Sequence, residues 1–372
     1  MQAICAQWTS DAKTPEVPGT MTAVVLRHAG RDGVEVGTVP IPQPGLMEVL
    51  CAVDAAYICG TDPHIINGDY PNFWPRGYPF VPGHEWAGTV VGLGEGTANF
   101  GWQVGDRVAG TSHCGCGYCR MCLTGRYNLC ENYGNEALGH RQYGHYTAGA
   151  YADYVVHSVK SLVRVPRAME LEEAAAIDPA AIALHTVKRA RLAPGDDVVV
   201  IGPGPMGLMV VQCALAMGAG RVLVVGRGLR LAKAEEIGAE PVDFSATDPV
   251  AAVISATGGT GADTVIDCAG SANSLAQAVE MTRRGGRISV VGIPLQNSPL
   301  PVAKLVLEEI DLHGVRANPN SAEEVLPLMQ RGLVSAQRLL THRFPLCEFA
   351  AALDTFVERR DGATKVLIVP DR

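Results

Sequence analysis

From residue 196 onward, short apolar segments alternate with segments of helical pattern, and this alternation limits the fold more than any other feature of the sequence. The apolar segments have the length of buried strands, and the segments between them are long enough to form helices. Such alternation is typical of a doubly wound parallel sheet in an α/β fold. Strands are predicted at 198–201, 222–225, 264–267, 287–291 and 312–315, and helices at 206–218, 229–237, 248–256, 273–283 and 302–308.

The first of these strands ends in the run Gly202-Pro203-Gly204-Pro205-Met206-Gly207. Because this G-x-G-x-x-G motif follows a strand and opens a helix, it has the context needed to bind a dinucleotide. Gly202 would allow the tight turn, Gly204 would let the backbone approach a pyrophosphate, and Gly207 would let helix and strand pack closely. A turn that is merely rich in glycine is the alternative.

The second predicted strand ends without the acidic residue that usually binds the ribose of NAD. No Asp or Glu occurs from 220 to 230; the strand ends in Gly226-Arg227, and Arg230 follows. A guanidinium there could pair with the 2′-phosphate of NADP, so NADP is favoured over NAD. The alternative is that Arg227 is solvated or stacks on the adenine of NAD.

The first part of the chain has a different pattern, with short strands separated by Gly and Pro. Strands are predicted at 22–27, 34–39, 48–57, 88–94, 105–108 and 149–156, a helical stretch at 171–191, helices at 322–331 and 348–358, and a last strand at 365–369. A chain of 372 residues exceeds what one core usually supports, so two domains are expected. The segment after 319 is too short to fold alone and is expected to return to the first domain.

Two short motifs in the first part combine ligand types that suit a catalytic zinc ion. Cys59 opens Cys59-Gly60-Thr61-Asp62-Pro63-His64, and His84 and Glu85 follow after an aromatic loop. A thiolate, an imidazole and a carboxylate can hold zinc while leaving one coordination position for a substrate oxygen. Asp178 precedes a proline within the helical stretch, where its carboxylate could turn inward. Taken singly, each of these residues is more often an ordinary core residue.

Four further cysteines have the spacing C-x2-C-x2-C-x7-C, namely Cys116, Cys119, Cys122 and Cys130. Four thiolates at such short intervals can close a tetrahedron around a structural zinc ion. Unligated thiols and an iron–sulfur cluster are the alternatives; in a ferredoxin the fourth cysteine would come sooner and precede a proline. Cys114 lies outside the spacing and is given no role.

Charge and composition exclude several classes of partner. The net charge of −8 argues against nucleic acid and anionic membranes, so a small-molecule substrate fits better. The uncharged segment 198–220 is long enough to span a bilayer, but its glycines and prolines favour a strand, turn and helix in a core. Residues 1–18 lack the pattern of an export signal, and an odd count of 11 cysteines favours a reducing compartment, so the cytoplasm is expected.

Together these motifs resemble the zinc-containing medium-chain dehydrogenase/reductase family over 22–369. The resemblance implies a β-rich GroES-like catalytic domain (1–170 and 318–372, with a structural-zinc lobe at 112–132) and a Rossmann cofactor domain (171–317). It implies two zinc ions per chain. The catalytic ion would be bound by Cys59 and His84 with Glu85 or Asp178, and the structural ion by the four cysteines.

The resemblance also implies contacts to the cofactor and a path for a proton. Lys365 would contact the pyrophosphate, and Val291-Gly292-Ile293 would lie beside the nicotinamide. Thr61 would take the proton of the alcohol and pass it through the cofactor ribose towards His64, although His64 could equally be a plain surface residue. Members of the family are dimers or tetramers, so a homo-dimer or homo-tetramer is expected.

The resulting hypothesis is a zinc- and NAD(P)-dependent dehydrogenase of a secondary alcohol or polyol. An aldehyde or enone reductase is the second interpretation, but zinc-free enone reductases lack the ligands at Cys59 and His84. A catalytically silent protein that keeps the cofactor for binding is the third.

Overall fold

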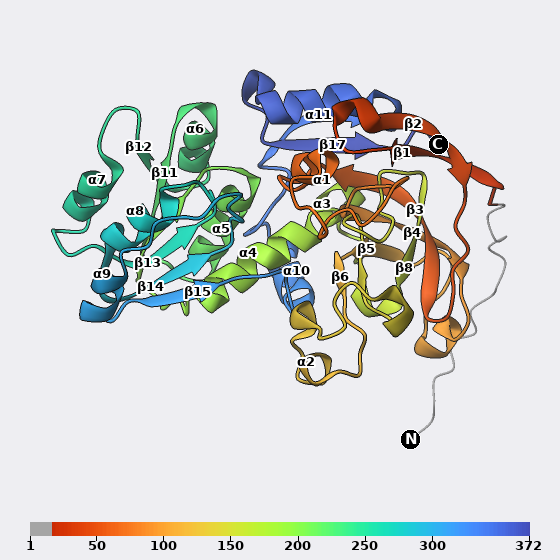
Figure 1. Cartoon of the computed structure of the whole chain (residues 1–372), viewed down its shortest axis with the longest axis horizontal. Helices are drawn as coiled ribbons and strands as arrows, with labels where there is room; N and C mark the ends of the chain where they lie inside the picture. Colours follow the sequence, from red (N-terminus) through yellow and green to blue (C-terminus); the bar gives the residue numbers. More distant parts are fainter. Residues whose placement is uncertain (1–16) are drawn as a thin grey trace.

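The structure is a computed structural model that describes residues 17–372. These residues form two bodies side by side, and helix α4 (Ile177–Arg189) runs between them (Figure 1). Residues 1–16 lie outside the described part. The predictions about an export signal and about the start of the first domain fall partly on these residues.

One body contains a parallel sheet with the strand order β12–β11–β10–β13–β14–β15. The chain runs from β10 outward to β12 and then crosses to β13, so the strand order reverses beside β10. In sheets of this kind, ligands bind outside the carboxyl ends of the strands at that reversal. The strands are β10 (Asp197–Ile201), β11 (Arg221–Gly226), β12 (Glu240–Asp243), β13 (Ala262–Asp267), β14 (Thr282–Val290) and β15 (Asp311–Gly314).

The predicted alternation of strand and helix is confirmed here, with one strand missed. β12 was not predicted because it is short and contains Pro241. A proline is tolerated there because β12 is an edge strand. The segment 198–220 forms β10 followed by the largely buried helix α5. No helix within residues 17–372 is long and apolar enough to cross a membrane. The helices of this body are α5 (Pro205–Ala216), α6 (Gly228–Glu236), α7 (Pro249–Ala256), α8 (Ser274–Met281) and α9 (Val302–Leu307).

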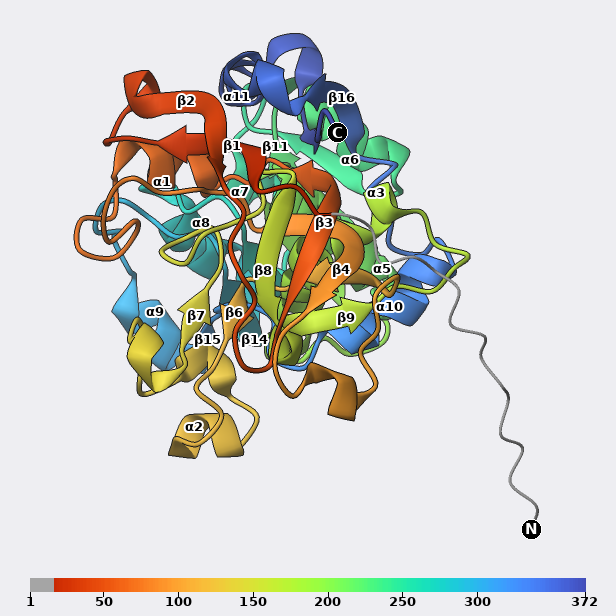
Figure 2. The same ribbon diagram turned by 90° about the vertical axis from the view of Figure 1, so that its right-hand side faces the viewer.

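The other body is built on a mixed sheet with the order β16–β17–β3–β4–β5–β9, in which β8 also pairs with β3 (Figure 2). A hairpin of β1 and β2 and a short pair of β6 and β7 complete it. Its strands are β1 (Thr20–Leu26), β2 (Val34–Pro40), β3 (Glu48–Tyr57), β4 (Glu85–Leu93), β5 (Arg107–Gly110), β6 (His113–Cys114), β7 (Arg141–Gln142), β8 (Tyr154–Ser158), β9 (Leu162–Arg164), β16 (Leu340–Pro345) and β17 (Lys365–Val369).

The carboxyl-terminal segment returns to the body that is built on the mixed sheet, as predicted. It contains α10 (Ala322–Gln330) and α11 (Phe349–Glu358), and its last strand β17 pairs with β3, with Leu367 opposite Tyr57. The edge strand β16 was not predicted. The residue boundaries assigned to the two domains stay a prediction.

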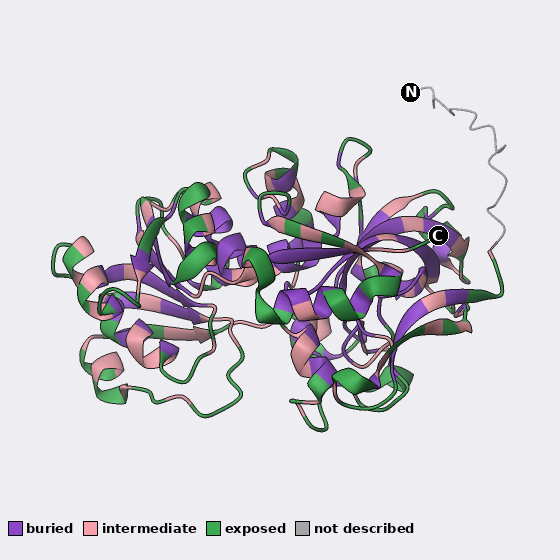
Figure 3. Ribbon diagram, turned by 90° about the horizontal axis from the view of Figure 1, so that it is seen from above, coloured by how far each residue is buried: buried purple, intermediate pink, exposed green. Residues whose placement is uncertain are grey.

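The predicted helical stretch 171–191 is two helices, α3 (Leu171–Ala174) and α4. Pro179 lies in the first turn of α4, where its missing N–H costs no helical hydrogen bond, so the break comes before it. One buried cluster joins side chains of α4, such as Leu184, to Val200 of β10 and Tyr57 of β3. The connecting helix is therefore part of a core that both bodies share. Figure 3 shows buried residues, in purple, in the interior of both bodies.

Candidate functional site

The structure brings Cys59, His84 and Glu85 together. Cys59 follows β3, His84 precedes β4, and these strands are antiparallel neighbours with Tyr57 opposite Glu85. One ligand atom from each of the three residues lies within 4.8 Å of the others. His84 and Glu85 are almost fully buried. A thiol, an imidazole and a carboxylate that converge in this way form a donor set that suits zinc. These three residues are a candidate zinc site and are called the metal-binding group below.

Asp62, the first residue of α1 (Asp62–Asn67), supports this group from behind. It is fully buried, and its Oδ1 lies 3.4 Å from His84 Nδ1. Its Oδ2 accepts hydrogen bonds from Cys59 N at 2.7 Å and Tyr151 Oη at 2.5 Å. Burial alone would lower the pKa of His84, but the charges of Asp62 and Cys59 outweigh it and raise that pKa well above its usual value. A carboxylate behind a ligating histidine fixes its ring and raises its basicity.

Asp62 was not among the predicted site residues, although it stands inside the motif that carries Cys59. The sequence signal that could have identified Asp62 is its position directly after Thr61, where the short helix α1 begins. Tyr151, which was read only as part of a strand, had no such signal.

Glu85 is held from the opposite end of the chain. The Nζ of Lys365, at the start of β17, forms an ion pair with Glu85 Oε2, and both side chains are buried to within 2 %. The ammonium also lies 5.0 Å from the ring centroid of Tyr57. The structure thus places Lys365 beside the metal-binding group, and its contact to a cofactor pyrophosphate stays a prediction.

Asp178 is buried in the first turn of α4, but its carboxylate does not join the group of Cys59, His84 and Glu85. Its Oδ1 accepts hydrogen bonds from Ser112 N and Asn318 Nδ2, both at 2.8 Å. Its Oδ2 is buried without a hydrogen-bond partner among residues 17–372. Burial raises the pKa of Asp178 to about 6, against the lowering effect of the charge on His84. An unpartnered buried carboxylate oxygen near the group is available to a cation, so Asp178 as a ligand stays a prediction.

Thr61 and His64 occupy different surroundings. Thr61 Oγ1 donates to Cys59 Sγ at 3.2 Å and lies 3.5 Å from His84 Nε2, so its hydroxyl is in the metal-binding group. His64 is partly exposed, and its Nδ1 lies 2.7 Å from Asp69 Oδ2. The structure therefore leaves His64 at the surface, paired with a carboxylate.

A wall of aromatic rings extends from the metal-binding group. The ring of His145 lies 4.4 Å from that of His84 and 4.6 Å from that of Trp74. Trp74 Nε1 donates to Tyr133 Oη at 2.8 Å. Burial and the charge of His84 lower the pKa of His145 to about 3, so its imidazole is neutral. Trp74 comes from the aromatic loop that precedes His84 in the sequence, whereas His145 and Tyr133 were missed.

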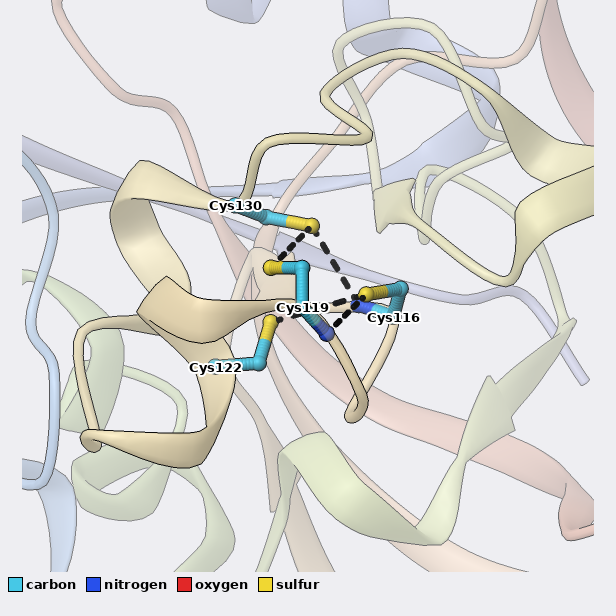
Figure 4. A group of neighbouring side chains, drawn as sticks. All are labelled: Cys116, Cys119, Cys122 and Cys130. Carbon is cyan, nitrogen blue, oxygen red and sulfur yellow. Dashed lines mark hydrogen bonds between the residues drawn. The ribbon is translucent and has the colours of Figure 1, made fainter.

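The four cysteines of the second motif meet around α2 (Arg120–Leu123) (Figure 4). The Sγ atoms of Cys116 and Cys122 are 3.8 Å apart and those of Cys119 and Cys130 are 3.9 Å apart. Burial raises the pKa of Cys116, but backbone N–H groups of Tyr118 and Cys119 outweigh it and hold the pKa at about 6. Four sulfurs at this separation can surround one tetrahedral ion. Cys114 lies in β6, outside the group.

The glycine motif joins β10 to α5, with Gly204 as the N-cap of that helix. Gly202 has a φ of 100°, a turn conformation that favours glycine. A Cβ at Gly207 would clash with the Gly202 carbonyl, whereas a Cβ at Gly204 would meet no described atom within 4 Å. Pro205 and Met206 form the first turn of α5. Gly204 therefore leaves open space beside the N-terminus of α5, the end of a helix that favours a phosphate.

The end of β11 explains the missing acidic residue. A Cβ at Gly226 would clash with the ring of Pro203, so no side chain fits there. Arg227, the N-cap of α6, lies with its guanidinium 5.5 Å from the ring centroid of Phe244. Arg230 instead donates from Nε and Nη2 to the Ala363 carbonyl oxygen in the other body. Of the two predicted arginines, Arg227 is the one whose guanidinium is not engaged by a carbonyl group among the described residues.

The run Val291, Gly292 and Ile293 follows β14 at the same edge of the sheet. The N–H groups of Val291 and Gly292 both donate to the Asp267 carbonyl oxygen at 3.0 Å. The backbones of Gly292 and Gly270 approach so closely that a Cβ at Gly292 would clash. Ile293 is half exposed. These residues lie at the carboxyl ends of the central strands, where the fold binds its ligands.

Two family models match the chain. "Alcohol dehydrogenase GroES-like domain" covers residues 45–167, and "Zinc-binding dehydrogenase" covers residues 205–331. Together they cover more than half of the chain.

Individual relatives match over nearly the whole length. A sorbitol dehydrogenase of Bacillus subtilis is 33% identical over 96% of this chain and 100% of its own. An L-threonine 3-dehydrogenase of the same organism is 33% identical over 95% and 99%. Among solved structures, the alcohol dehydrogenase TADH from Thermus sp. ATN1 superposes with a TM-score of 0.85, at 33% identity, over 94% of this chain and 100% of that chain.

Proposed function

The chain belongs to the zinc-containing medium-chain dehydrogenase/reductase family, and on that premise we propose that it oxidises a secondary alcohol or polyol with NAD(P), reversibly. The observation that carries this proposal is the convergence of Cys59, His84 and Glu85 at the ends of β3 and β4. The names of relatives such as the sorbitol dehydrogenase support the substrate class.

The residues present fit a catalytic zinc ion. Cys59 and His84 would bind it together with a carboxylate, which is either Glu85 within the group or Asp178 with its unpartnered Oδ2. Bound there, zinc would act as a Lewis acid on the substrate hydroxyl, and a nicotinamide would accept the hydride. Asp62 would hold the His84 ring in place through Nδ1.

Thr61 is the residue that would handle the proton. Its hydroxyl lies beside Cys59 Sγ and His84 Nε2, so it can accept a proton from a substrate hydroxyl bound at this group. His64, partly exposed and paired with Asp69, would release the proton to solvent. Lys365 would orient the Glu85 carboxylate through their ion pair.

The second group, Cys116, Cys119, Cys122 and Cys130, would hold a structural zinc ion. It has four sulfur ligands and therefore no free position for a substrate. Two zinc ions per chain follow.

For the cofactor, NADP is the proposal. A carboxylate that would repel the 2′-phosphate of NADP cannot stand at position 226, because Pro203 fills the space. Arg227 has a guanidinium available to pair with that phosphate. The pyrophosphate would lie at the N-terminus of α5, on the turn from Gly202 to Gly207.

A homo-oligomer in the cytoplasm completes the proposal. β15 is an edge strand of its sheet, and nearby apolar side chains are exposed, including Val302, Val306 and Leu307 of α9. Exposed apolar patches beside an unpaired edge support association between copies. The ten cysteines of the described residues are all free, which suits a reducing compartment.

The experiment that tests the function counts zinc per purified chain by elemental analysis and then follows nicotinamide absorbance with a panel of secondary alcohols, polyols and ketones. NAD and NADP are supplied separately. We expect two zinc ions, turnover of at least one alcohol, and a higher kcat/KM with NADP. Arg227→Ala should remove most of that preference. Bound zinc with no turnover over the whole panel would instead favour a catalytically silent protein.

A further inference from the structure

Arg316 lies in the loop that follows β15, and hydrogen bonds tie this loop to Asn128 and to α4. Its own carbonyl oxygen accepts a hydrogen bond from Asn128 Nδ2 at 2.8 Å. Two residues later, Asn318 is fully buried and donates from Nδ2 to Asp178 Oδ1 at 2.8 Å. The same loop therefore carries both Arg316 and the hydrogen-bond partner of the Asp178 carboxylate.

The guanidinium of Arg316 lies among aromatic rings. Its Cζ is 4.5 Å from the ring centroid of Tyr133 and 5.6 Å from that of Phe73. Its Nη2 is buried and has no hydrogen-bond partner in the part of the chain that the structure describes. No Asp or Glu side chain of residues 17–372 forms an ion pair with it. The aromatic faces stabilise the cation only in part, because ring quadrupoles do not replace a hydrogen-bonded anion.

This unpaired cation belongs to the wall that leads to the metal-binding group. Tyr133 joins Arg316 to Trp74, Trp74 contacts His145, and His145 contacts His84. Burial, followed by the charge of Arg316, lowers the pKa of the neighbouring His140 to about 4, so that imidazole is neutral. Two guanidinium groups therefore lie against Tyr133, and of these Arg76 is exposed whereas Arg316 is partly buried.

We propose that Arg316 binds the carboxylate of the substrate, so that the enzyme acts on hydroxy acids whose hydroxyl group lies at Cys59, His84 and Glu85. A guanidinium with a free N–H is suited to a carboxylate because it offers a charge and planar donors together. The proposal rests on the proposed dehydrogenase function for its substrate hydroxyl, but the carboxylate site itself does not require turnover.

The first experiment measures binding, so that it does not depend on knowing the substrate. Butyrate and its neutral counterpart butyramide are titrated calorimetrically into the zinc-loaded protein with oxidised cofactor. We expect butyrate to bind the wild type at least tenfold more tightly than butyramide, and Arg316→Gln to remove that difference. Because the metal is common to both proteins, a direct carboxylate–metal contact would leave the preference in place in R316Q. Equal binding of the two probes to the wild type, or a preference that survives in R316Q, would overturn the proposal.

Two further variants separate a binding role from a structural one. Arg316→Lys keeps the charge and should retain part of the preference for butyrate. Arg76→Gln is the matched control, because Arg76 is an exposed guanidinium 6.0 Å from the same Tyr133 ring. We expect R76Q to keep the wild-type preference within about threefold. If R76Q lost the preference as fully as R316Q does, general disturbance of the aromatic wall would explain both and the proposal would fail.

Steady-state kinetics then tests the substrate class with matched pairs, gluconate against sorbitol and 3-hydroxybutyrate against 1,3-butanediol. We expect a higher kcat/KM for the acid of at least one pair, and a loss of about 100-fold for that acid in R316Q, in line with a charge-assisted contact. A preference for the neutral member in both pairs would contradict the substrate class. Absence of any turnover, with the binding preference intact, would overturn the dehydrogenase function and leave the carboxylate site standing.

Discussion

The two sulfur-containing groups of this chain differ in how they are assembled. Cys116, Cys119, Cys122 and Cys130 come from one short segment around α2. Cys59, His84 and Glu85 come from the ends of two strands, and a lysine 280 residues away from Glu85 is paired with it. The first group depends on local spacing, whereas the second depends on the whole sheet being formed.

This difference separates a structural role from a chemical one. Four thiolates fill every coordination position of a tetrahedral ion. Such a group can stabilise a lobe but cannot bind a substrate. The group at β3 and β4 is supported by Asp62, Tyr151 and Lys365, which fix its ligands from behind. Its rigidity comes from buried polar contacts, and the predictions below measure how far the two groups are independent.

The largest effect is expected from Cys59→Ala. Removing the thiolate ligand should lower kcat by about 10⁴-fold, because the Lewis acid lowers the activation free energy by several kcal/mol. Elemental analysis should show zinc falling from two ions per chain to one, with thermal unfolding changed little. Loss of both ions would mean that the two groups are not independent.

Thr61→Ala should separate chemistry from metal binding within the same group. Without the hydroxyl, turnover should fall by roughly 10²–10³-fold, the range of general acid–base catalysis, while both zinc ions stay bound. Steady-state rates and zinc content measure this, and Thr61→Ser serves as the control that restores the hydroxyl. Unchanged turnover in T61A would remove Thr61 from the proton path.

Cys119→Ser should give the opposite pattern at the other group. The lobe would lose its ion and about 2–4 kcal/mol of stability, the scale at which loss of a metal ligand destabilises a domain. A calorimetric scan should show a lower Tm, and kcat at low temperature should fall far less than in the Cys59 variant. A Tm equal to that of the wild type would argue against a structural ion.

The smallest effect is expected from the residues behind the ligands. Asp62→Asn should weaken zinc binding at the catalytic group by roughly 10–100-fold, because His84 loses its carboxylate partner. Asn132→Ala is the matched change at the other group, where Asn132 Nδ2 donates to Cys116 Sγ at 3.4 Å, and a smaller loss is expected there. Competition with a chelator measures both affinities, and a stronger effect of Asn132→Ala would reverse the comparison.

The sequence was sufficient for the features that depend on local spacing. The alternation after residue 196 predicted the parallel sheet, and the cysteine intervals predicted a group that the structure brings together. The short edge strands β12 and β16 were missed, because Pro241 and alternating polar residues such as His342 hide their pattern.

Contacts between distant segments could not be predicted in this way. The ion pair of Lys365 with Glu85 and the engagement of Arg230 by Ala363 depend on where β17 and its neighbouring turn meet the rest of the fold. Arg316 had no sequence signal at all, since its significance lies in the rings around it. A residue such as Arg316 is recognised only in the folded chain, where its buried polar atom has no hydrogen-bond partner among the described residues.

The ion pair between the last strand and Glu85 also sets an order of events during synthesis. A ribosome adds about 5–20 residues per second, so roughly a quarter of a minute to one minute separates the emergence of Glu85 from that of Lys365. During this interval β3 has no β17 beside it, and the carboxylate has no cation. Nascent chains would therefore expose an unfinished sheet edge to chaperones and proteases. An ion at Cys59, His84 and Glu85 would be retained only after translation is almost complete, whereas the four cysteines around α2 could hold an ion much earlier.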